Sequence, residues 1–213
     1  MKYVQQKNSY NIISKSKYII TRPYENKGRW NQIFGNNNPI HLELGMGRGE
    51  MIIKLAQQNP KINYIGLELD DGQISFAAKR LIGKDIPNLK FISGNALALE
   101  KMFGKEIDLI YLTFSEPWPK KHDEDKRFTH INYLKIYDKV FKKKKHIIMK
   151  TDNKGLFAYS LESLSQYWYT FNKVSMDLHH DERNIPNIMT EFESNYAKTT
   201  NKPIYYVDAT FEG

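Results

Sequence analysis

Residues 41–50 read HLELGMGRGE, and this stretch decides the fold. An apolar run of strand length ends near Glu43, and Gly45, Gly47 and Gly49 then form a turn before an apolar stretch of helical character. A strand, a glycine turn and a helix in this order are typical of α/β sheets that bind nucleotides. The glycines allow the backbone to approach a ligand closely.

The spacing of the glycines differs from a dinucleotide fingerprint. The pattern G-x-G-x-x-G would need its third glycine where this chain has Glu50. A pyrophosphate would also lie near the carboxylates of Glu43 and Glu50, which repel phosphate and attract a cation. S-adenosylmethionine has an ammonium and a sulfonium group and no phosphate, so the charge at the turn favours this methyl donor. Glu43, Gly45 and Gly47 are the first predicted cofactor-binding residues.

Two polar residues at later strand ends support a nucleoside ligand. Glu68 follows Gly45 by roughly 20 residues, close to the spacing at which an acid accepts hydrogen bonds from ribose hydroxyls. Asn95 follows another strand-like run, and its amide can both donate to and accept from the adenine edge. Because loops after parallel strands meet at one sheet edge, we expect these side chains to share a site. The alternative is that the glycines only turn the chain and the acids are solvated.

Short apolar runs alternate with helical patterns along the chain. The expected strands are residues 40–44, 64–69, 89–93, 109–114 and 146–150, followed by 171–179 and 203–211. The alternation predicts parallel crossover units, and the last two runs, which are separated by a segment without a clear helical period, predict an antiparallel pair at one edge. The fold class is therefore α/β, a doubly wound, mostly parallel seven-stranded sheet with helices on both faces. Phe157 and Trp168 fall on an apolar helix face and are expected in the core.

Composition limits the possible functions. The 213 residues suit one domain with or without an arm, and 32 basic against 24 acidic side chains give a net charge of +8, the sign expected for a polyanion partner. The absence of cysteine excludes disulfides, thiolate metal sites and a cysteine nucleophile. His179 and His180 lack the spacing of a metal site, so no metal is expected. No secretory or membrane-spanning pattern occurs, which predicts a cytoplasmic protein.

The first 38 residues differ in composition from the rest of the chain. They are polar and end in a Gly-Asn-Asn-Asn-Pro cluster at 35–39, which marks a boundary. We therefore expect an N-terminal arm over 1–38 and a single domain over 39–213. Basic residues interleaved with tyrosines make the arm a candidate RNA contact, with a purely structural role equally open. The lysines at 142–145 are better explained as a solvated turn.

A loop with two prolines follows the strand-like run 109–114. Its sequence is SEPWPKK (115–121), and the prolines restrict the backbone around Glu116 and Trp118. A carboxylate in this place can accept hydrogen bonds from the N–H groups of guanine, and an indole offers a stacking face. As a bare turn, the loop would need no ligand.

Five motifs together carry a family resemblance. They are ELGMGRG (43–49), YIGLEL (64–69), FSEPWPKK (114–121), KTDNKGLF (150–157) and NIMTEFE (187–193). With these motifs the chain resembles the bacterial tRNA (guanine-N7)-methyltransferases, which have the class I, Rossmann-like methyltransferase fold. The proline-rich loop and the late TEFE are the most specific, since many methyltransferases share the glycine turn.

The resemblance implies methyl transfer from S-adenosylmethionine to N7 of a guanosine in the variable loop of tRNA. It implies that Glu43, Glu68, Asn95 and Glu116 contact S-adenosylmethionine, and that Lys120, Asp152, Thr190, Glu191, Phe192 and Glu193 meet the RNA. Glu116 is the expected catalytic residue. The family generally has Asp at this position, and its following segment is commonly strongly basic. Here residues 120–127 have four basic and three acidic side chains.

Two rival functions remain open at this point. One is an RNA methyltransferase acting on an exocyclic amine, such as N6 of adenine, whose fourth-strand motif also combines a polar residue, a proline and an aromatic residue. The order Ser-Glu-Pro-Trp-Pro fits that motif poorly. The other is a noncatalytic RNA-binding protein with the same fold, against which the acidic, glycine-rich turn argues. The oligomeric state is not readable from the sequence.

Overall fold

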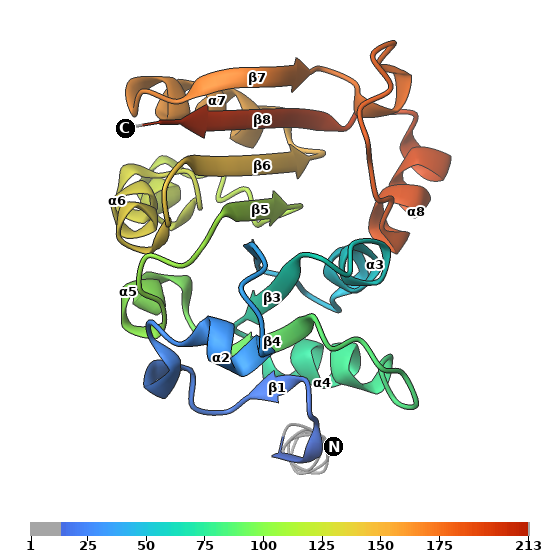
Figure 1. The fold of residues 1–213 in the computed structure, drawn as a ribbon. Coiled ribbons are helices and arrows are strands. Elements are labelled where there is room, and N and C mark those ends of the chain that lie inside the picture. The colour runs from blue at the N-terminus through green and yellow to red at the C-terminus, as the bar shows by residue number, and fades with distance from the viewer. Residues whose placement is uncertain (1–13, 213) are drawn as a thin grey trace.

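The computed structural model describes residues 14–212, and these form one sheet of eight strands flanked by helices (Figure 1). The strand order is β1-β4-β3-β2-β5-β6-β8-β7. The strands are β1 (Ile19–Ile20), β2 (Ile40–Leu44), β3 (Asn63–Glu68), β4 (Leu89–Ser93), β5 (Leu109–Thr113), β6 (Lys145–Thr151), β7 (Thr170–Ser175) and β8 (Tyr205–Phe211). Strand β8 is antiparallel to both β6 and β7, and the other described neighbours are parallel.

The predicted doubly wound, mostly parallel sheet with an antiparallel edge is confirmed, and the strand count is corrected from seven to eight. All seven expected strands form within one or two residues of their predicted starts. The additional strand, β1, has only two residues and pairs Ile19 with Phe91 and Ile20 with Ile92. A two-residue strand is too short to show the alternation by which strands are recognised in a sequence.

Helices cover both faces of the sheet, as alternate side chains of the strands show. On β3, Ile65 and Leu67 pack into one core cluster, whereas Tyr64 packs into the other. Helices α2, α5, α6 and α7 belong to the first cluster, and α3 and α4 to the second. The helices are α2 (Trp30–Phe34), α3 (Glu50–Gln58), α4 (Asp71–Lys79), α5 (Leu99–Met102), α6 (Ile131–Val140), α7 (Lys154–Gln166) and α8 (Glu191–Thr200). Short 3₁₀ turns are η1 (Pro23–Asn26), η2 (Ala96–Ala98), η3 (Lys121–Lys126) and η4 (Leu178–His180).

Several helices begin directly after a strand because a polar side chain caps them there. Asp70 follows β3 and accepts hydrogen bonds from the backbone N–H groups at the start of α4, and Asn153 does the same for α7 after β6. Asn95 caps the 3₁₀ turn η2 after β4. Such caps satisfy backbone donors that a helix start leaves unpaired. They fix where each chain segment turns at the carboxyl edge of the sheet.

Residues 14–38, which fall in the segment expected to be an arm, pack on the sheet. The Trp30 side chain is fully buried, its indole N–H donates to the Met102 carbonyl at 2.9 Å, and its ring stacks on Phe103. The Tyr18 hydroxyl donates to the Lys84 carbonyl at 2.6 Å. Packed structure therefore begins before residue 39. The lysine and tyrosines of residues 1–13 that were considered as RNA contacts lie outside the described residues.

Two local expectations about the C-terminal half were wrong. The Trp168 side chain is 80% exposed, because α7 ends at Gln166 and Trp168 adopts φ +67° in the turn that follows. Phe157, by contrast, is buried as predicted. The segment between the last two strands, in which no helical period was seen, contains α8. None of the helices within residues 14–212 combines the length and the apolar character that crossing a bilayer requires.

Candidate active site

The glycine turn after β2 adopts backbone angles that require glycine. Gly45, Gly47 and Gly49 have φ values of +69°, +54° and +69°, in the left-handed region where a side chain costs about 1–2 kcal/mol. Nothing lies within 4 Å of the place where a Cβ of Gly47 would stand. Gly47 is therefore needed for its backbone angle and leaves open space at the carboxyl edge of the sheet.

Glu43 is buried just before this turn and has an unusual electrostatic environment. Its side chain is 2% exposed, and its Oε2 atom has no hydrogen-bond partner among the described residues. Burial raises the pKa of the Glu43 carboxyl to about 8, although the Lys150 ammonium opposes this effect. A buried carboxylate oxygen without a partner costs free energy, and a cationic ligand would remove that cost.

Glu68 connects the end of β3 to the glycine turn. Its Oε2 atom accepts a hydrogen bond from the Gly47 N–H at 2.9 Å, and its Oε1 atom accepts from the N–H groups of Leu69 and Asp70. The carboxylate is thus held in one orientation at the sheet edge. The Oε2 atom has a second lone pair, so a ribose hydroxyl can still donate to it. The Asn95 side-chain oxygen accepts from the Leu97 N–H, which leaves its amide group as the donor for a base.

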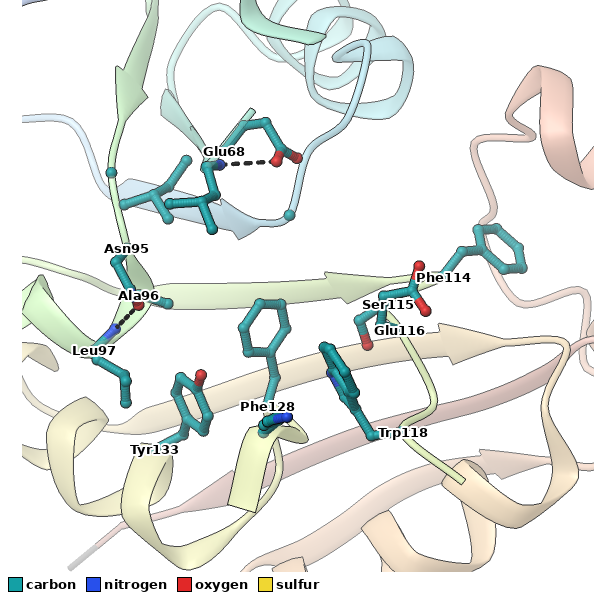
Figure 2. Close-up of a pocket in the computed structure, with 15 residues that line it drawn as sticks. Glu68, Asn95, Ala96, Leu97, Phe114, Ser115, Glu116, Trp118, Phe128 and Tyr133 are labelled. Carbon is teal, nitrogen blue, oxygen red and sulfur yellow. Dashed lines mark hydrogen bonds between the residues drawn. The ribbon is translucent and has the colours of Figure 1, made fainter. Parts of the chain in front are cut away.

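An apolar cavity of about 540 Å³ opens between these two strand ends. We call it the apolar cavity, and its lining includes Glu68, Leu69, Asn95, Leu97, Trp118, Phe128 and Tyr133. In Figure 2 the rings of Trp118, Phe128 and Tyr133 stand on one side of it and Glu68 on the other. Flat apolar walls with a ribose-binding acid and an amide suit an adenosine group.

The loop after β5 is held in a strained conformation next to this cavity. Phe114 and Trp118 have φ values of +49° and +43°, which are uncommon for bulky residues and cluster at functional sites. The Arg127 guanidinium stabilises the loop by donating to the carbonyls of Pro117 and Trp118, with the shortest distance 2.9 Å. Glu116 lies between the two strained residues and is exposed.

A second cavity of about 520 Å³ lies on the other side of Glu116. We call it the acidic cavity because its lining includes the carboxyl groups of Glu43, Glu50, Glu116, Asp152 and Glu191. Gly45, Phe114, Ser115 and Glu116 line both cavities. All the predicted cofactor-binding residues, and four of the six predicted substrate residues, therefore line two adjoining cavities, with Glu116 at their common border.

A buried ion pair supports the wall of the acidic cavity. The Lys150 ammonium at the end of β6 donates to the Glu193 carboxylate at 2.6 Å and to the Ile188 carbonyl at 2.8 Å. His179 and Asn187 also bind that carboxylate. Although burial raises the pKa of Glu193, these neighbours outweigh it and hold the pKa below its ordinary value. Glu193 is fully buried, so it shapes the site from within and its side chain does not face solvent.

The residues of the TEFE motif have different structural roles. Thr190 and Glu193 form a capping box at the start of α8, so the motif is a helix start. Glu191 lines the acidic cavity, and its backbone N–H donates to Glu50 Oε2 at 2.7 Å. Phe192 is 48% exposed and packs against Phe114 with 4.9 Å between ring centroids. Figure 1 shows α8 lying beside α3 at this edge.

Lys120 and the buried Glu193 are the two predicted site residues that line neither cavity. Lys120 lies on the surface instead. It is exposed and precedes η3. Of the basic residues in its loop, Lys126 reaches the apolar cavity, with its ammonium 4.7 Å from the centre of the Trp118 ring. Three contributors to the site had no role in the sequence analysis: Arg127, Phe128 and Lys150. Only Lys150 left a signal, since a charge at the end of a buried strand implies a buried partner.

The residues fit S-adenosylmethionine. The unpartnered Glu43 oxygen suits an ammonium group, the open space at Gly47 allows a ligand close to the backbone, and Glu68 with Asn95 suits an adenosine. The carboxylates would attract the positive charge of this ligand and would repel a pyrophosphate. These features belong to the two adjoining cavities at the carboxyl edge of the sheet, where ligands bind in doubly wound folds.

Solved structures of two methyltransferases share this fold. A chain described as an antibiotic-related methyltransferase has a TM-score of 0.66 and 20% identity, covering 86% of this chain and 94% of that one. The 16S rRNA methyltransferase KamB has a TM-score of 0.64 and 13% identity, covering 87% and 94%. These two likenesses show the fold. A family model described as a putative methyltransferase matches residues 37–206, and with the fit of the cavities it gives the class: the chain is an S-adenosylmethionine-dependent methyltransferase.

Sequence comparison gives the particular family. A tRNA (guanine-N(7)-)-methyltransferase of Streptococcus suis (strain 05ZYH33) is 42% identical over 202 residues, 94% of each chain. One of Geobacillus sp. (strain WCH70) is 44% identical over 192 residues, 90% of this chain and 87% of the relative. The chain belongs to the family of tRNA (guanine-N7)-methyltransferases.

Proposed function

We propose that this enzyme methylates N7 of a guanosine in the variable loop of tRNA. Family membership supports tRNA as the substrate and guanine N7 as the acceptor. The observation that carries the proposal from the structure is the pair of adjoining cavities with Glu116 at their border. The same proposal places the enzyme in the cytoplasm, where its tRNA substrate is found.

The apolar cavity and the glycine turn would hold the cofactor. Glu68 and Asn95 would bind its adenosine, and Glu43 with the turn at Gly45 and Gly47 would bind its amino acid end. When bound, S-adenosylmethionine supplies a methyl group on a positively charged sulfur. The protein residues then have to hold the acceptor base in line with that group and exclude water from it.

The acidic cavity suits a guanine base. The Watson–Crick edge of guanine has N–H donors, and Asp152 and Glu191 present carboxylates that can accept from them. Phe192 would contact the base or its sugar from the cavity wall. Thr190 and Glu193 would act through the start of α8, which they stabilise. Lys120, exposed near the mouth, would contact the RNA outside the cavities.

Guanine N7 has an in-plane lone pair and no proton, so no general base is needed. Positive charge moves onto the base as the new bond forms, and a carboxylate close to the ring stabilises it electrostatically. Glu116 is the candidate for this role because it lies where the two cavities meet. We therefore assign Glu116 to charge stabilisation and positioning.

The geometry of RNA favours a nucleotide outside a regular helix. N7 lies on the major-groove edge, and this groove is deep and narrow in A-form RNA. A guanine in a duplex would therefore not reach a cavity at the edge of the sheet. A loop nucleotide can be turned out of its stack at lower cost, which supports the variable loop as the target.

The test uses an unmodified tRNA transcript and S-adenosylmethionine with a labelled methyl group. We expect the label in N7-methylguanosine after digestion to nucleosides, and chain cleavage at that nucleoside should map it to the variable loop. A transcript with adenosine at the mapped position should accept no label. Label in N6-methyladenosine would favour the exocyclic-amine alternative, and RNA binding without transfer would favour the noncatalytic one.

A further inference from the structure

Two arginines share one aromatic ring beside the acidic cavity but differ in their partners. The Arg48 guanidinium lies 4.5 Å from the centre of the Phe76 ring, and the Arg80 guanidinium lies 5.3 Å from it. Arg80 donates to Glu50 at 2.9 Å and to Glu191 at 3.2 Å. For Arg48, no hydrogen bond or ion pair forms within residues 14–212. One arginine is therefore neutralised by carboxylates, while the other keeps its donors free.

Arg48 is also the single basic residue among those that line the acidic cavity within the described chain. It is exposed and belongs to the glycine turn, between Gly47 and Gly49. The stacking on Phe76 limits the freedom of its side chain, which lowers the entropy cost of binding a ligand. An unpaired, partly ordered guanidinium at the edge of a cavity is suited to an oxyanion, because its planar fork donates two parallel hydrogen bonds.

The RNA substrate supplies such a group and needs such a contact. A guanosine that enters a cavity lined with carboxylates brings phosphates on both sides of its sugar. These phosphates would be repelled by Glu50 and Glu191 unless a cation lies between. The charge of Arg80 is already neutralised by its two carboxylate partners. Arg48 can bind a phosphate without breaking an ion pair.

We propose that the Arg48 guanidinium binds a backbone phosphate next to the guanosine that enters the acidic cavity. This inference rests on the proposed function, since it assumes that RNA approaches this cavity. Phe76 acts as a positioning residue, because the guanidinium of Arg48 stacks on the face of its ring. Arg80 acts within the protein, where it joins α3 and α8 through Glu50 and Glu191.

The experiment compares tRNA binding by the full-length protein and by Arg48→Ala over a series of salt concentrations. Each neutralised phosphate contributes a fixed amount to the slope of log K against log salt. We expect Arg48→Ala to reduce that slope by about one and to weaken binding at low salt by roughly tenfold. Arg48→Lys keeps the charge and should retain most of the slope. Phe76→Leu should weaken binding less than Arg48→Ala does.

The matched control is Lys143→Ala, which removes the same charge from an exposed position before β6, at the opposite edge of the sheet. It should leave the slope close to that of the unaltered protein. An equal loss of slope in both variants would overturn the proposal by showing only a general charge effect. An unaltered slope in Arg48→Ala, with weaker binding of S-adenosylmethionine in calorimetry, would assign Arg48 to the carboxylate of the cofactor instead.

The design separates this inference from the proposed function. Binding slopes are measured without methyl transfer, so they report on Arg48 even if the labelled nucleoside is not N7-methylguanosine. A wrong methylated nucleoside with a reduced slope would overturn the proposed acceptor and keep the phosphate contact. N7-methylguanosine together with an unaltered slope would support the proposed acceptor and overturn the phosphate contact of Arg48.

Discussion

The apolar cavity and the acidic cavity adjoin each other but differ in how their polar groups are satisfied. In the apolar cavity, Glu68 already accepts three backbone hydrogen bonds and Asn95 caps a 3₁₀ turn. In the acidic cavity, Glu43 Oε2 is buried without a partner in the described chain. The polar groups of the first cavity are thus held by the protein itself, whereas the second contains a buried acid oxygen that a ligand could bind.

The walls of the two cavities also differ. The apolar cavity is built from strand ends and from rings such as Phe128 and Tyr133, which pack on the main core. The wall of the acidic cavity depends on α8, which the Lys150–Glu193 ion pair ties to β6. Under the proposed assignment, the comparison teaches that binding of the neutral adenosine would rely on shape, and recognition of the acceptor on charges held in place by other charges.

The largest expected effect comes from breaking the buried ion pair. Lys150→Met leaves the Glu193 carboxylate buried without its ammonium partner, so we expect a loss of about 3–5 kcal/mol in the free energy of unfolding. Unfolding in denaturant measures this loss of free energy. The double variant Lys150→Met, Glu193→Leu should recover part of this loss, because no unpaired charge remains.

The surface pair of Lys17 and Asp85 is the matched control, since both side chains are largely exposed. Lys17→Met should change the unfolding free energy little, because solvent screens exposed pairs. If Lys150→Met were no more destabilising than Lys17→Met, the acidic cavity would not depend on this ion pair, and the contrast between the two walls would be lost.

The next largest effect is expected at the border of the two cavities. Glu116→Ala should lower kcat by about 100-fold, since it removes a carboxylate placed to stabilise charge on the acceptor base. The Kd of S-adenosylmethionine should change far less. Glu116→Asp, which restores the residue usual in the family, should keep most of the activity. Single-turnover rates and calorimetry measure the two quantities, and unchanged turnover in Glu116→Ala would remove this residue from the mechanism.

The smallest expected effect is a pH dependence of cofactor binding. With a pKa of about 8, Glu43 holds a proton at neutral pH in the free protein and must release it to bind an ammonium group. Affinity should therefore rise by up to about tenfold per pH unit between pH 6 and 7.5, with release of close to one proton. Calorimetry in buffers of different ionisation enthalpy measures this release. Glu43→Gln should abolish it, and a pH-independent affinity in the unaltered protein would contradict the assignment.

The same pKa has a consequence for stability. The unfolded chain loses the Glu43 proton near pH 4.5, whereas the folded chain keeps it to about pH 8. The unfolded state therefore binds fewer protons between these values, and the contribution of Glu43 to the free energy of unfolding falls as pH rises through this window. Glu43→Gln should remove that part of the pH dependence.

Much of the fold was predictable because its strands are apolar runs separated by polar turns. Residues 41–50 were enough to predict strand β2 and the glycine turn. The antiparallel edge was predicted from β7 and β8 because no helical period was recognised between them. Helix α8 was missed because its exposed face leaves few apolar residues. The Thr190-x-x-Glu193 capping box was the signal that could have found it.

Site residues that lie at strand ends could be predicted from the sequence. Site residues whose role depends on partners elsewhere in the chain could not. Glu43, Glu68 and Asn95 follow from their position after parallel strands, which converge at one edge. Arg127 donates to the carbonyls of Pro117 and Trp118, which lie 10 and 9 residues before it, and no sequence pattern reports this contact. Glu193 was assigned to the substrate by resemblance, but burial and its ion pair place it behind the cavity wall.

The strained backbone at Phe114 and Trp118 has a consequence for inhibition. Both residues hold left-handed angles that cost about 1–3 kcal/mol each, and the hydrogen bonds from Arg127 help to maintain those at Trp118. A small molecule that displaced Arg127 would let this loop relax and move Glu116 away from the border. Such a compound would occupy neither cavity, but bound S-adenosylmethionine would oppose it, because Trp118 and Glu116 line the apolar cavity and coupling between two sites is reciprocal.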